Sequence, residues 1–275
     1  MKVKTFRFTM SALMFLMAAL GAANAQNSCS KSIMACGCAI TSSGTYTVNA
    51  DLSASQGLTT QGSCIDVSAS NVKLFTNGHN ITGEGTGVGL HLLSDASSIF
   101  VSGTGPGEVS YSLFSGWQYA VESQASKVTA EGFYASNNQT GVLLKGTQGN
   151  SFAAVFSFSN STYGIWIWGG SANVVGGSWA MGNGVAGIYI GSASGSDSKS
   201  YSENENASTG NLVFQSSGAG QNYGLMVQDG NTGNTLVDNS FSGDNAYDLF
   251  DGNAGGASNL WHSNSFVTAN VKYIQ

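Results

Sequence analysis

Asparagines recur along this chain at a fixed interval. Asn137, Asn160 and Asn183 follow one another in steps of 23, and the pair Asn222 and Asn245 repeats that step. A second column keeps pace with the first and contains Asn150, Asn173, Asn211, Asn234 and Asn259. Self-similarity at such a period indicates supersecondary units stacked in a row, each contacting only its neighbours. We therefore expect a rod rather than a closed globule, with any function on its outer surface.

Each unit opens with a glycine and continues as a short strand. Gly141, Gly164 and Gly187 follow in the same steps of 23, and Gly224 comes after a step of 37, which is one repeat plus an insertion of 14. After Gly164 the sequence Ile-Trp-Ile-Trp alternates with the period of two that is typical of a strand. Two glycine-rich turns then separate two further short strands. Three short strands in each repeat predict one coil of a parallel β-helix, in an all-β, single-domain chain.

Alternation also sorts the first strand of each coil into inward and outward columns. The inward columns are aliphatic and contain Leu90, Val121, Val142, Ile165, Ile188 and Leu225, then Leu92, Leu144, Ile167, Ile190 and Val227. The outward columns contain His91, Glu122, Leu143, Trp166, Tyr189 and Met226, then Lys145, Trp168 and Gln228. At the last coil we expect Trp261 and Phe266 to cover the open end, and Asp248 to turn inward onto free backbone groups.

Residues 1–25 have the composition of a secretory signal peptide. Lys2, Lys4 and Arg7 precede an apolar run, and Ala23-Asn24-Ala25 has the small-x-small pattern of a cleavage site. No later stretch reaches the roughly 18 to 20 apolar residues of a spanning helix. We therefore expect a secreted, periplasmic or extracellular chain with no transmembrane segment after cleavage.

Charge argues against nucleic acid as a partner. Three of the nine basic residues lie in the signal peptide, which leaves six against fifteen acids and a net charge of −9 for the remainder. The six are all lysines, so the expected mature chain contains no arginine. Such a chain lacks the basic surface that nucleic acids require.

Cysteines occur only near the start of the expected mature chain. Cys29, Cys36, Cys38 and Cys64 lie within residues 26–70, which we interpret as an N-terminal cap stapled by disulfides. A cap would cover the first hydrophobic rung of an open rod. The cysteines allow three pairings, of which we favour Cys29–Cys36 with Cys38–Cys64. A metal site at Cys36-Gly37-Cys38 is the alternative, but no second ligand pair lies near it in the sequence.

Several segments resemble secreted right-handed parallel β-helix repeat proteins. The opening coil N-V-K-L-F-T-N-G-H-N-I-T-G at residues 71–83 carries the likeness, as do the closing Y-D-L-F-D-G-N at 247–253 and N-x-W-x-x-N-x-F at 259–266. The resemblance covers about residues 36–270 and implies the pectate-lyase-like superfamily fold over 71–275, with an insertion loop at 192–208. That superfamily includes lyases, hydrolases, epimerases, adhesins and a copper-maturation factor, so the resemblance implies no single activity.

Catalytic chemistry has few candidates. Lyases of this resemblance typically use an arginine base, which leaves Lys145 as the substitute base, with Glu122 as the nearest outward acid and His91 beside it. One acid is too few for a calcium site, and no pair of acids falls on one outward strand as glycoside hydrolysis requires. His79, His91 and His262 lie far apart along the rod, so we expect no metal and no cofactor.

Aromatic residues supply the candidate ligand surface. Trp166, Trp168 and Tyr189 are predicted to form a contiguous exposed patch, and such patches often mark interaction surfaces. The alternative is that the insertion at 192–208 covers them, as a lid or as a groove wall. We therefore expect an exported, non-catalytic module that binds a glycan or a cell-surface partner. The alternative is a polysaccharide lyase or epimerase that acts on an acidic polysaccharide through Lys145, Glu122 and His91.

Overall fold

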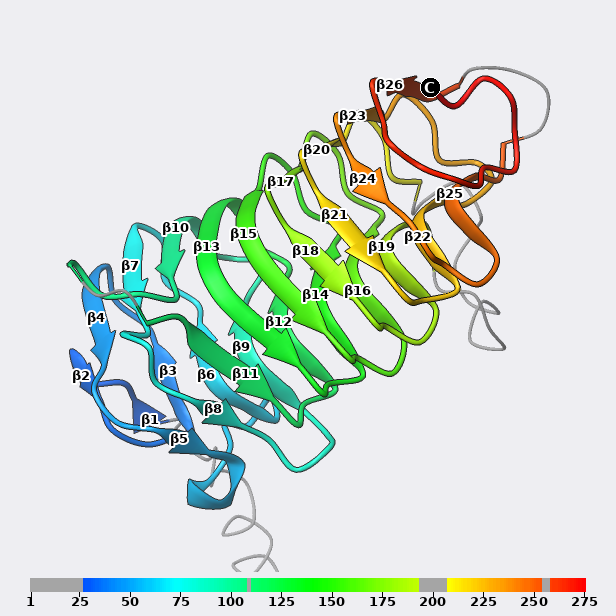
Figure 1. Cartoon of the computed structure of the whole chain (residues 1–275). Coiled ribbons are helices and arrows are strands. Elements are labelled where there is room, and N and C mark those ends of the chain that lie inside the picture. Colours follow the sequence, from blue (N-terminus) through cyan, green and yellow to red (C-terminus); the bar gives the residue numbers. More distant parts are fainter. Residues whose placement is uncertain (1–26, 108–109, 193–206, 254–257) are drawn as a thin grey trace, which may run out of the picture.

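The chain forms a rod of stacked coils, with the first strands at one end and the C-terminus at the other (Figure 1). The structure is a computed structural model that describes residues 27–107, 110–192, 207–253 and 258–275. Every strand pairs in parallel with strands of the neighbouring coils. The expected right-handed parallel β-helix is confirmed. The predicted signal peptide and nearly all of the insertion loop lie outside the described residues.

The strands form two sheets. The ten-stranded sheet, called sheet A, consists of β1 (Asn27–Ser28), β3 (Cys38–Ile40), β6 (Ser63–Val67), β9 (Val88–Leu92), β12 (Tyr119–Ser123), β14 (Thr140–Lys145), β16 (Tyr163–Trp168), β19 (Ala186–Ile190), β22 (Tyr223–Val227) and β25 (Tyr247–Asp251). It contributes one strand to each coil.

The second sheet, called sheet B, has 16 strands and bends to form two faces of the rod. Its first face consists of β2 (Ser32–Ile33), β4 (Gly44–Val48), β7 (Val72–Phe75), β10 (Ser97–Ser102), β13 (Ser126–Ser136), β15 (Ser151–Phe158), β17 (Val174–Gly176), β20 (Leu212–Phe214), β23 (Thr235–Val237) and β26 (Leu260–His262). Its second face consists of β5 (Leu52–Ser53), β8 (Ile81–Thr82), β11 (Ser112–Ser115), β18 (Trp179–Met181), β21 (Ser217–Ala219) and β24 (Ser240–Phe241).

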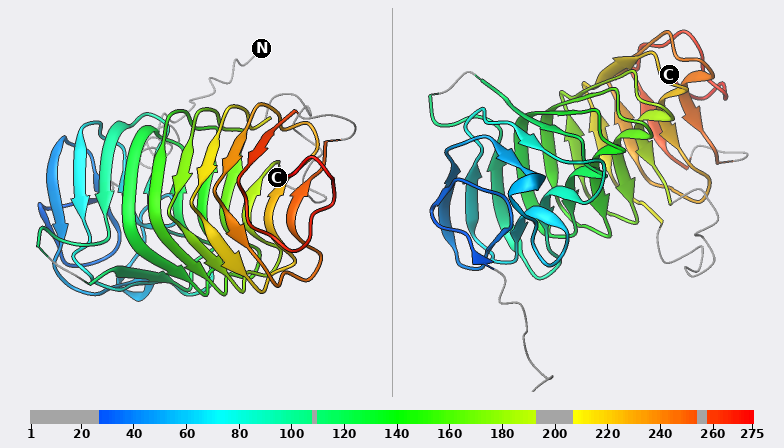
Figure 2. Two further views of the ribbon diagram at one scale, coloured as in Figure 1. Left: turned by 45° about the horizontal axis from the view of Figure 1, so that its top comes forward. Right: turned by 90° about the horizontal axis from the view of Figure 1, so that it is seen from below.

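Two long strands join the faces of sheet B. The first part of β13 pairs with β10 and its last part pairs with β11, while β15 pairs with β17 and then with β18. Both strands sweep around the rod in Figure 2. A short 3-10 helix, η1 (Ala54–Gln56), is the one helix among the described residues, and none of these residues forms a helix long and apolar enough to cross a membrane.

The hydrophobic core is a set of vertical columns inside the stack. Val142, Ile165, Ile188 and Leu225 pair in register from β14 to β22, and each is fully buried. The second predicted inward column is buried in the same way. Because each coil places the same side-chain type over its neighbour, short strands bury a continuous apolar interior that no single coil could form.

The repeated glycine has a steric cause. A Cβ at Gly141 would lie 2.5 Å from the carbonyl oxygen of Gly164, and one at Gly164 would lie 2.4 Å from that of Gly187. Gly187 faces the Gly224 carbonyl oxygen in the same way, at 2.7 Å. Backbones of successive coils therefore approach too closely at this corner for any side chain.

One asparagine column forms a hydrogen-bonded ladder along the rod. At each step the backbone N–H of one asparagine donates to the side-chain oxygen of the asparagine in the next coil, as Asn150 does to Asn173 at 3.1 Å. The side-chain amide often donates to the same oxygen, as Asn173 does to Asn211 at 3.0 Å. The bonds continue through Asn234 to Asn259, and all five residues are buried. Stacked amides therefore provide hydrogen-bond partners for the buried polar groups at this corner of the rod.

The other column differs from the prediction. Asn138, not Asn137, donates from its amide to Asn160 at 3.0 Å, and Asn160 donates to Asn183. Asn137 instead has a φ of 57°, so it forms the turn. Further along, the Gln221 backbone N–H donates to Asp244 in the ladder position, while the neighbouring Asn245 amide donates to Asn222 at 3.4 Å on the exposed side. The ladder is thus shifted by one residue from the predicted column, because the turns that follow Asn138 and Gln221 are one residue shorter than the same turn in the next coil.

The N-terminal disulfides also differ from the favoured pairing. Cys29 is bonded to Cys38, and Cys36 to Cys64. The first bond joins the residue that follows β1 to β3, because β1 pairs with β3. The second joins the segment before β3 to β6 in the next coil. Pairing follows from which cysteines the stacking brings together, and not from their order along the chain.

The C-terminal end is closed as expected. Trp261 is buried, and its indole N–H donates to Asp251 at 2.9 Å, while Phe266 packs against the core. Asp248 is also buried and accepts hydrogen bonds from the backbone N–H groups of Val267 and Thr268, each at 2.8 Å. A charged carboxylate therefore satisfies backbone donors that would otherwise lack partners at the end of the stack.

Candidate functional site

All six residues predicted for catalysis or ligand binding lie on the outer face of sheet A. His91, Glu122, Trp166 and Tyr189 share one stripe along the rod, with Leu143 between Glu122 and Trp166. Lys145 and Trp168 face each other in the next stripe. The strands that carry these residues are β9, β12, β14, β16 and β19. Stacking therefore gathers onto one surface residues that lie far apart in the sequence.

The three aromatic residues form one cluster, as predicted. The Trp166 and Trp168 rings stack at 5.1 Å with an interplanar angle of 4°, and Tyr189 lies 6.1 Å from Trp166. Tyr163 joins them, stacked on Tyr189 at 4.6 Å. We call these four residues the sheet A cluster.

The sheet A cluster is not the exposed patch that was expected. Trp166 is 7% exposed and Tyr189 is 1% exposed, and only Trp168 is partly open. Polar groups hold the rings in place: the Trp166 indole donates to the Gly191 carbonyl at 2.8 Å, and the Tyr189 hydroxyl bonds to Gln228 at 2.7 Å. The prediction that the insertion covers this cluster falls outside the described residues.

The opposite end of the same stripe is polar. Asp66 on β6 pairs in register with His91, and His91 pairs with Glu122, so two carboxylates flank one imidazole. His91 Nδ1 lies 3.6 Å from Asp66 Oδ1, and Gln124 donates to Glu122 at 2.9 Å. Neither ring nitrogen of His91 makes a hydrogen bond to any residue that the structure describes. Tyr119 lies nearby, where burial and then the charge of Glu122 raise the pKa of its hydroxyl.

Burial limits what this polar stripe can do. Asp66 has no exposed surface, and His91 and Glu122 are more than nine-tenths buried. Lys145, the candidate base, holds its ammonium 4.9 Å from the centre of the Trp168 ring, an attractive cation–π geometry. The sequence analysis missed Asp66 because its partner lies in the next coil, and the disulfide-containing coils were treated as a cap without an outward column.

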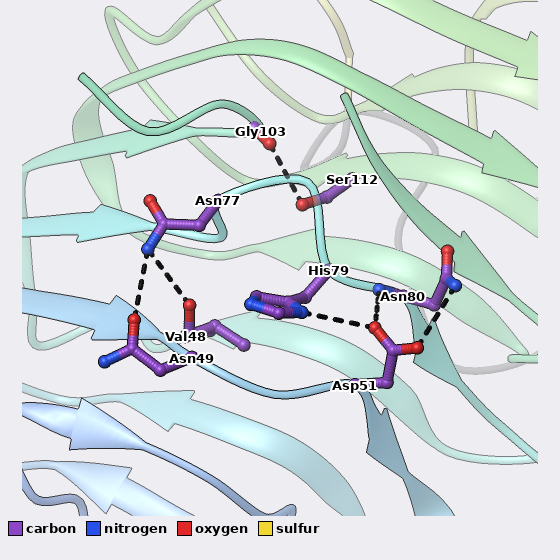
Figure 3. A network of polar contacts seen from close by, with 8 residues as sticks. All are labelled: Val48, Asn49, Asp51, Asn77, His79, Asn80, Gly103 and Ser112. Carbon is purple, nitrogen blue, oxygen red and sulfur yellow. Dashed lines mark hydrogen bonds and ion pairs between the residues drawn. The ribbon is translucent and has the colours of Figure 1, made fainter. Parts of the chain in front are cut away.

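The remaining histidines are not part of this surface. Figure 3 shows His79 bonded through Nδ1 to Asp51 at 3.3 Å, where the Asn80 backbone N–H also donates to Asp51 at 2.9 Å. The Asn80 N–H bond is the main cause that lowers the pKa of Asp51. His262 lies on β26 at the far end of the rod. No group of three His, Cys, Asp or Glu side chains is arranged to hold a metal ion in the described part of the chain.

A second aromatic surface lies on sheet B and was not predicted. Tyr134 on β13, Phe156 on β15 and Trp179 on β18 occupy the same register position in three successive coils. Ring centres of Tyr134 and Phe156 are 5.0 Å apart, and those of Phe156 and Trp179 are 5.8 Å apart. Tyr111 packs against both Tyr134 and Phe156. We call these four residues the aromatic row.

The aromatic row is open to solvent. Trp179 is 51% exposed and Tyr111 is 41% exposed, and Met181 beside Trp179 is also exposed. A signal for the row was present in the sequence, because Tyr134, Phe156 and Trp179 follow one another at nearly the same interval as the asparagines. The alignment of outward columns covered the first strand of each coil and did not extend to the third.

Known proteins resemble this chain in fold but not in sequence. No protein-family model matches the chain, and no curated protein matches it in sequence. An alginate lyase from Paenibacillus sp. str. FPU-7 has a similar structure with a TM-score of 0.53 at 12% identity, over 87% of this chain and 92% of that one. Pectate lyase Pel9A gives 0.45 at 15% identity, over 87% and 71% of the two chains.

A third similar structure is the tailspike protein of E. coli bacteriophage HK620 in complex with a hexasaccharide, with a TM-score of 0.44 at 11% identity, over 88% of this chain and 43% of that one. The chain is a right-handed parallel β-helix with the pectate-lyase-like fold. At such low identities the likeness extends to the fold alone, so function has to be argued from the surfaces described above.

Proposed function

We propose that this protein binds a glycan through the aromatic row on sheet B. The observation that carries the proposal is the position of Trp179, a half-exposed indole in register with Phe156 and Tyr134. Exposed tryptophan and tyrosine are costly to leave in water unless a partner covers them. Flat rings with a polar edge suit ligands that present both C–H faces and hydroxyl groups, as sugars do.

The proposal moves the binding site away from the sheet A cluster. Trp166 and Tyr189 lack the exposed ring surface on which a sugar would stack, because their own neighbours already cover them. The aromatic row keeps such surface at Tyr111 and Trp179. The ligand class is therefore the one we inferred from the sequence, while the proposed residues differ.

Two tryptophan substitutions decide between the faces. The full mature protein is incubated with a panel of soluble polysaccharides, and binding is followed by affinity gel electrophoresis. We expect Trp179→Ala to lose binding by roughly thirtyfold or more, the size of a hot-spot side chain. Leu260→Ala, an exposed apolar residue on the other face of sheet B, is the matched control and should bind normally.

Trp166→Ala completes the test. If a folded Trp166→Ala variant loses binding while Trp179→Ala retains it, the sheet A cluster is the site and the proposal is wrong about the face. If the protein binds none of the polysaccharides, glycan binding itself is contradicted.

A second candidate function is cleavage of a polysaccharide on sheet A. It is favoured by one observation, that Asp66 and Glu122 lie two coils apart on either side of His91. Coils spaced by roughly 4.8 Å put these carboxylates about 10 Å apart, slightly more than the widest pair that acts on either side of a glycosidic bond. Asp66 has no exposed surface, so Glu122 is the carboxylate of this pair that a substrate could reach. Incubation with polysaccharides, followed by reducing-end and ultraviolet absorbance assays, tests for hydrolysis and elimination. Activity that disappears in Glu122→Gln would establish this function.

We also propose that the protein works outside the cytoplasm. Residues 1–25 have the pattern of a signal peptide, and two disulfides fit an oxidising compartment. Mass spectrometry of the protein recovered from its native host should find a chain that begins at Gln26. A full-length chain in the cytoplasm would contradict export.

A further inference from the structure

The aromatic row continues into a row of serines. Trp179 pairs in register with Ser217, Ser217 pairs with Ser240, and Ser240 pairs with Ser265 in the last coil. One straight line along the rod therefore carries three aromatic residues followed by three hydroxyl groups. Ser240 and Ser265 are exposed, and Ser217 is half-buried. We call these three residues the serine row.

We propose that the ligand is an uncharged glycan that runs along the rod axis from Trp179 over the serine row. This inference rests on the proposed function and specifies the ligand class and the orientation of the bound chain. A pyranose ring is about as long as the spacing of roughly 4.8 Å between successive coils. One sugar can therefore stack on Trp179 while the next ones lie over successive serines.

Trp179 is where the row opens toward a ligand. On one side it meets Phe156 edge to face at 5.8 Å, with an interplanar angle of 76°. On the other side the register position is Ser217, a side chain too small to cover an indole. The residues next to Ser217 in β21 are Gly218 and Ala219, so this side of Trp179 adjoins a low surface.

The hydroxyl groups of the serine row are available to a ligand. Their backbone N–H groups donate to the preceding coil, Ser217 to Ser178 and Ser240 to Ser216, each at 2.9 Å. Their side-chain hydroxyls make no hydrogen bond to another described residue. Each hydroxyl can both donate and accept, as a sugar hydroxyl can. An apolar partner such as a second hydrophobic protein surface would leave these groups without partners, which costs binding energy.

Charge selects among glycans. The strands β11, β15, β18, β21 and β24 contain no Asp, Glu, Lys or Arg. Three acids lie close to the exposed strands in sequence: Glu131 in β13, and Asp238 and Asp244 on either side of β24. The one lysine of β13, Lys127, lies at its start, in the part that pairs with β10. The expected mature chain carries a net charge of −9. A polyanion would meet no cation on these short strands and would be repelled by the acids beside them, so the surface fits an uncharged chain.

The test compares uncharged and acidic polysaccharides. The mature protein is titrated calorimetrically with a soluble β-glucan, a galactomannan, alginate and polygalacturonate, at low and at high salt. We expect binding to an uncharged polysaccharide that does not weaken with salt, because no ion pair contributes. Binding only to the acidic chains would overturn the ligand class while leaving glycan binding intact.

Serine variants test the path of the bound glycan along the rod. The triple variant Ser217→Ala, Ser240→Ala, Ser265→Ala should bind at least about tenfold more weakly, because several hydrogen bonds to the ligand are lost. The matched control is Ser115→Ala with Ser136→Ala, two serines on the same face that lie beside the start of the aromatic row. The control should bind like the wild type, and circular dichroism should be unchanged in both variants.

The outcomes separate this inference from the proposed function. If Trp179→Ala loses binding and the serine triple variant does not, the glycan binds at the aromatic row but not along the serines. If the control variant weakens binding and the triple variant does not, the glycan extends from Trp179 toward Phe156 and Tyr134 and not over the serine row. If neither Trp179→Ala nor the triple variant alters binding, the proposed function and this inference both fail.

Discussion

Trp166 and Trp179 both point outward from a coil, yet Trp166 is 7% exposed and Trp179 is 51% exposed. The difference comes from their neighbours. Trp166 lies in a six-residue strand, with Trp168 stacked on one side and Leu143 and Tyr189 in the adjoining coils. Trp179 begins a three-residue strand and is followed by Ser217 in the next coil. A side chain that points outward is therefore not necessarily exposed. Its exposure depends on the side chains in the coils above and below.

The two surfaces also differ in charge. The outer face of sheet A carries Asp66, His91, Glu122 and Lys145 beside its rings. The face of sheet B around the aromatic row carries no charged side chain on its short strands. The aromatics beside the charges are buried, whereas those beside the hydroxyls are exposed to solvent, and the proposed ligand surface therefore lies on sheet B.

The largest effect expected is the loss of stability in Trp166→Ala. Removing a buried indole deletes its contacts and leaves a cavity, which costs roughly 3–5 kcal/mol in free energy of unfolding. The Gly191 carbonyl also loses its donor. Urea denaturation measures the change. A loss below about 1 kcal/mol, the size of an average point substitution, would show that the sheet A cluster is not packed as described.

Tyr189→Phe should have the next largest effect. The hydroxyl has one proton for two nearby acceptors, Gln228 Oε1 at 2.7 Å and the Ser192 carbonyl at 3.0 Å. Gln228 Oε1 also accepts from the Ser192 hydroxyl at 3.1 Å, so the variant removes one hydrogen bond and should lose about 1 kcal/mol. Tyr134→Phe is the matched control on the aromatic row, since no hydrogen bond of the Tyr134 hydroxyl occurs among the described residues. Equal losses in the two variants would contradict the contrast between the two surfaces.

Asp244 lies between β24 of sheet B and β25 of sheet A, and its charge should make stability depend on pH. Burial, and then the neighbouring Asp248, raise its pKa to about 6. Because the folded state holds this proton more tightly than the unfolded state, its contribution is full below pH 3.8 and is lost as pH rises through about 6.

Asp244→Asn should therefore stabilise the rod at pH 8. The asparagine restores the ladder residue, keeps the acceptor for the Gln221 N–H and adds amide donors, a gain of about 1 kcal/mol. Near pH 4 the gain should shrink, because the acid is then largely protonated. Thermal denaturation of both proteins across this range measures the effect, and a gain that is independent of pH would contradict the assigned pKa.

The smallest effect expected is that of Trp179→Ala on stability. A half-exposed side chain beyond the core contributes little to folding, so the free energy of unfolding should change by less than about 1 kcal/mol. Glycan binding should be lost in the same sample. If the variant unfolds more easily by several kcal/mol, the aromatic row is a structural element like the sheet A cluster.

Much of this structure could be predicted from sequence intervals. Spacing of asparagines and glycines predicted the stacking, and alternation predicted that Val142, Ile165 and Ile188 form one buried column. The same alignment placed His91, Glu122, Trp166 and Tyr189 in one stripe, which the strand register confirms. These features depend only on the repeat, which is visible in a single chain.

Other features depended on the tertiary structure and could not be predicted from intervals. Asn138, and not Asn137, holds the ladder position because the turn that follows it is one residue shorter than in the next coil. The interval from Asn137 to Asn160 is still 23, so the interval alone does not reveal this shift. The cysteine pairing and the contact between Asp66 and His91 both follow from the way the first coils stack. In each case the partner lies in another coil, where local sequence carries no information about distance.

The sequence by itself determined that this chain folds as a solenoid and which side chains point into it, because both follow from a period repeated along one strand direction. The tertiary structure alone decided which outward aromatics are covered and which meet water. Solvent exposure is set by the size of the side chains that stacking places alongside. A tryptophan between two rings is enclosed, and a tryptophan beside a serine remains open.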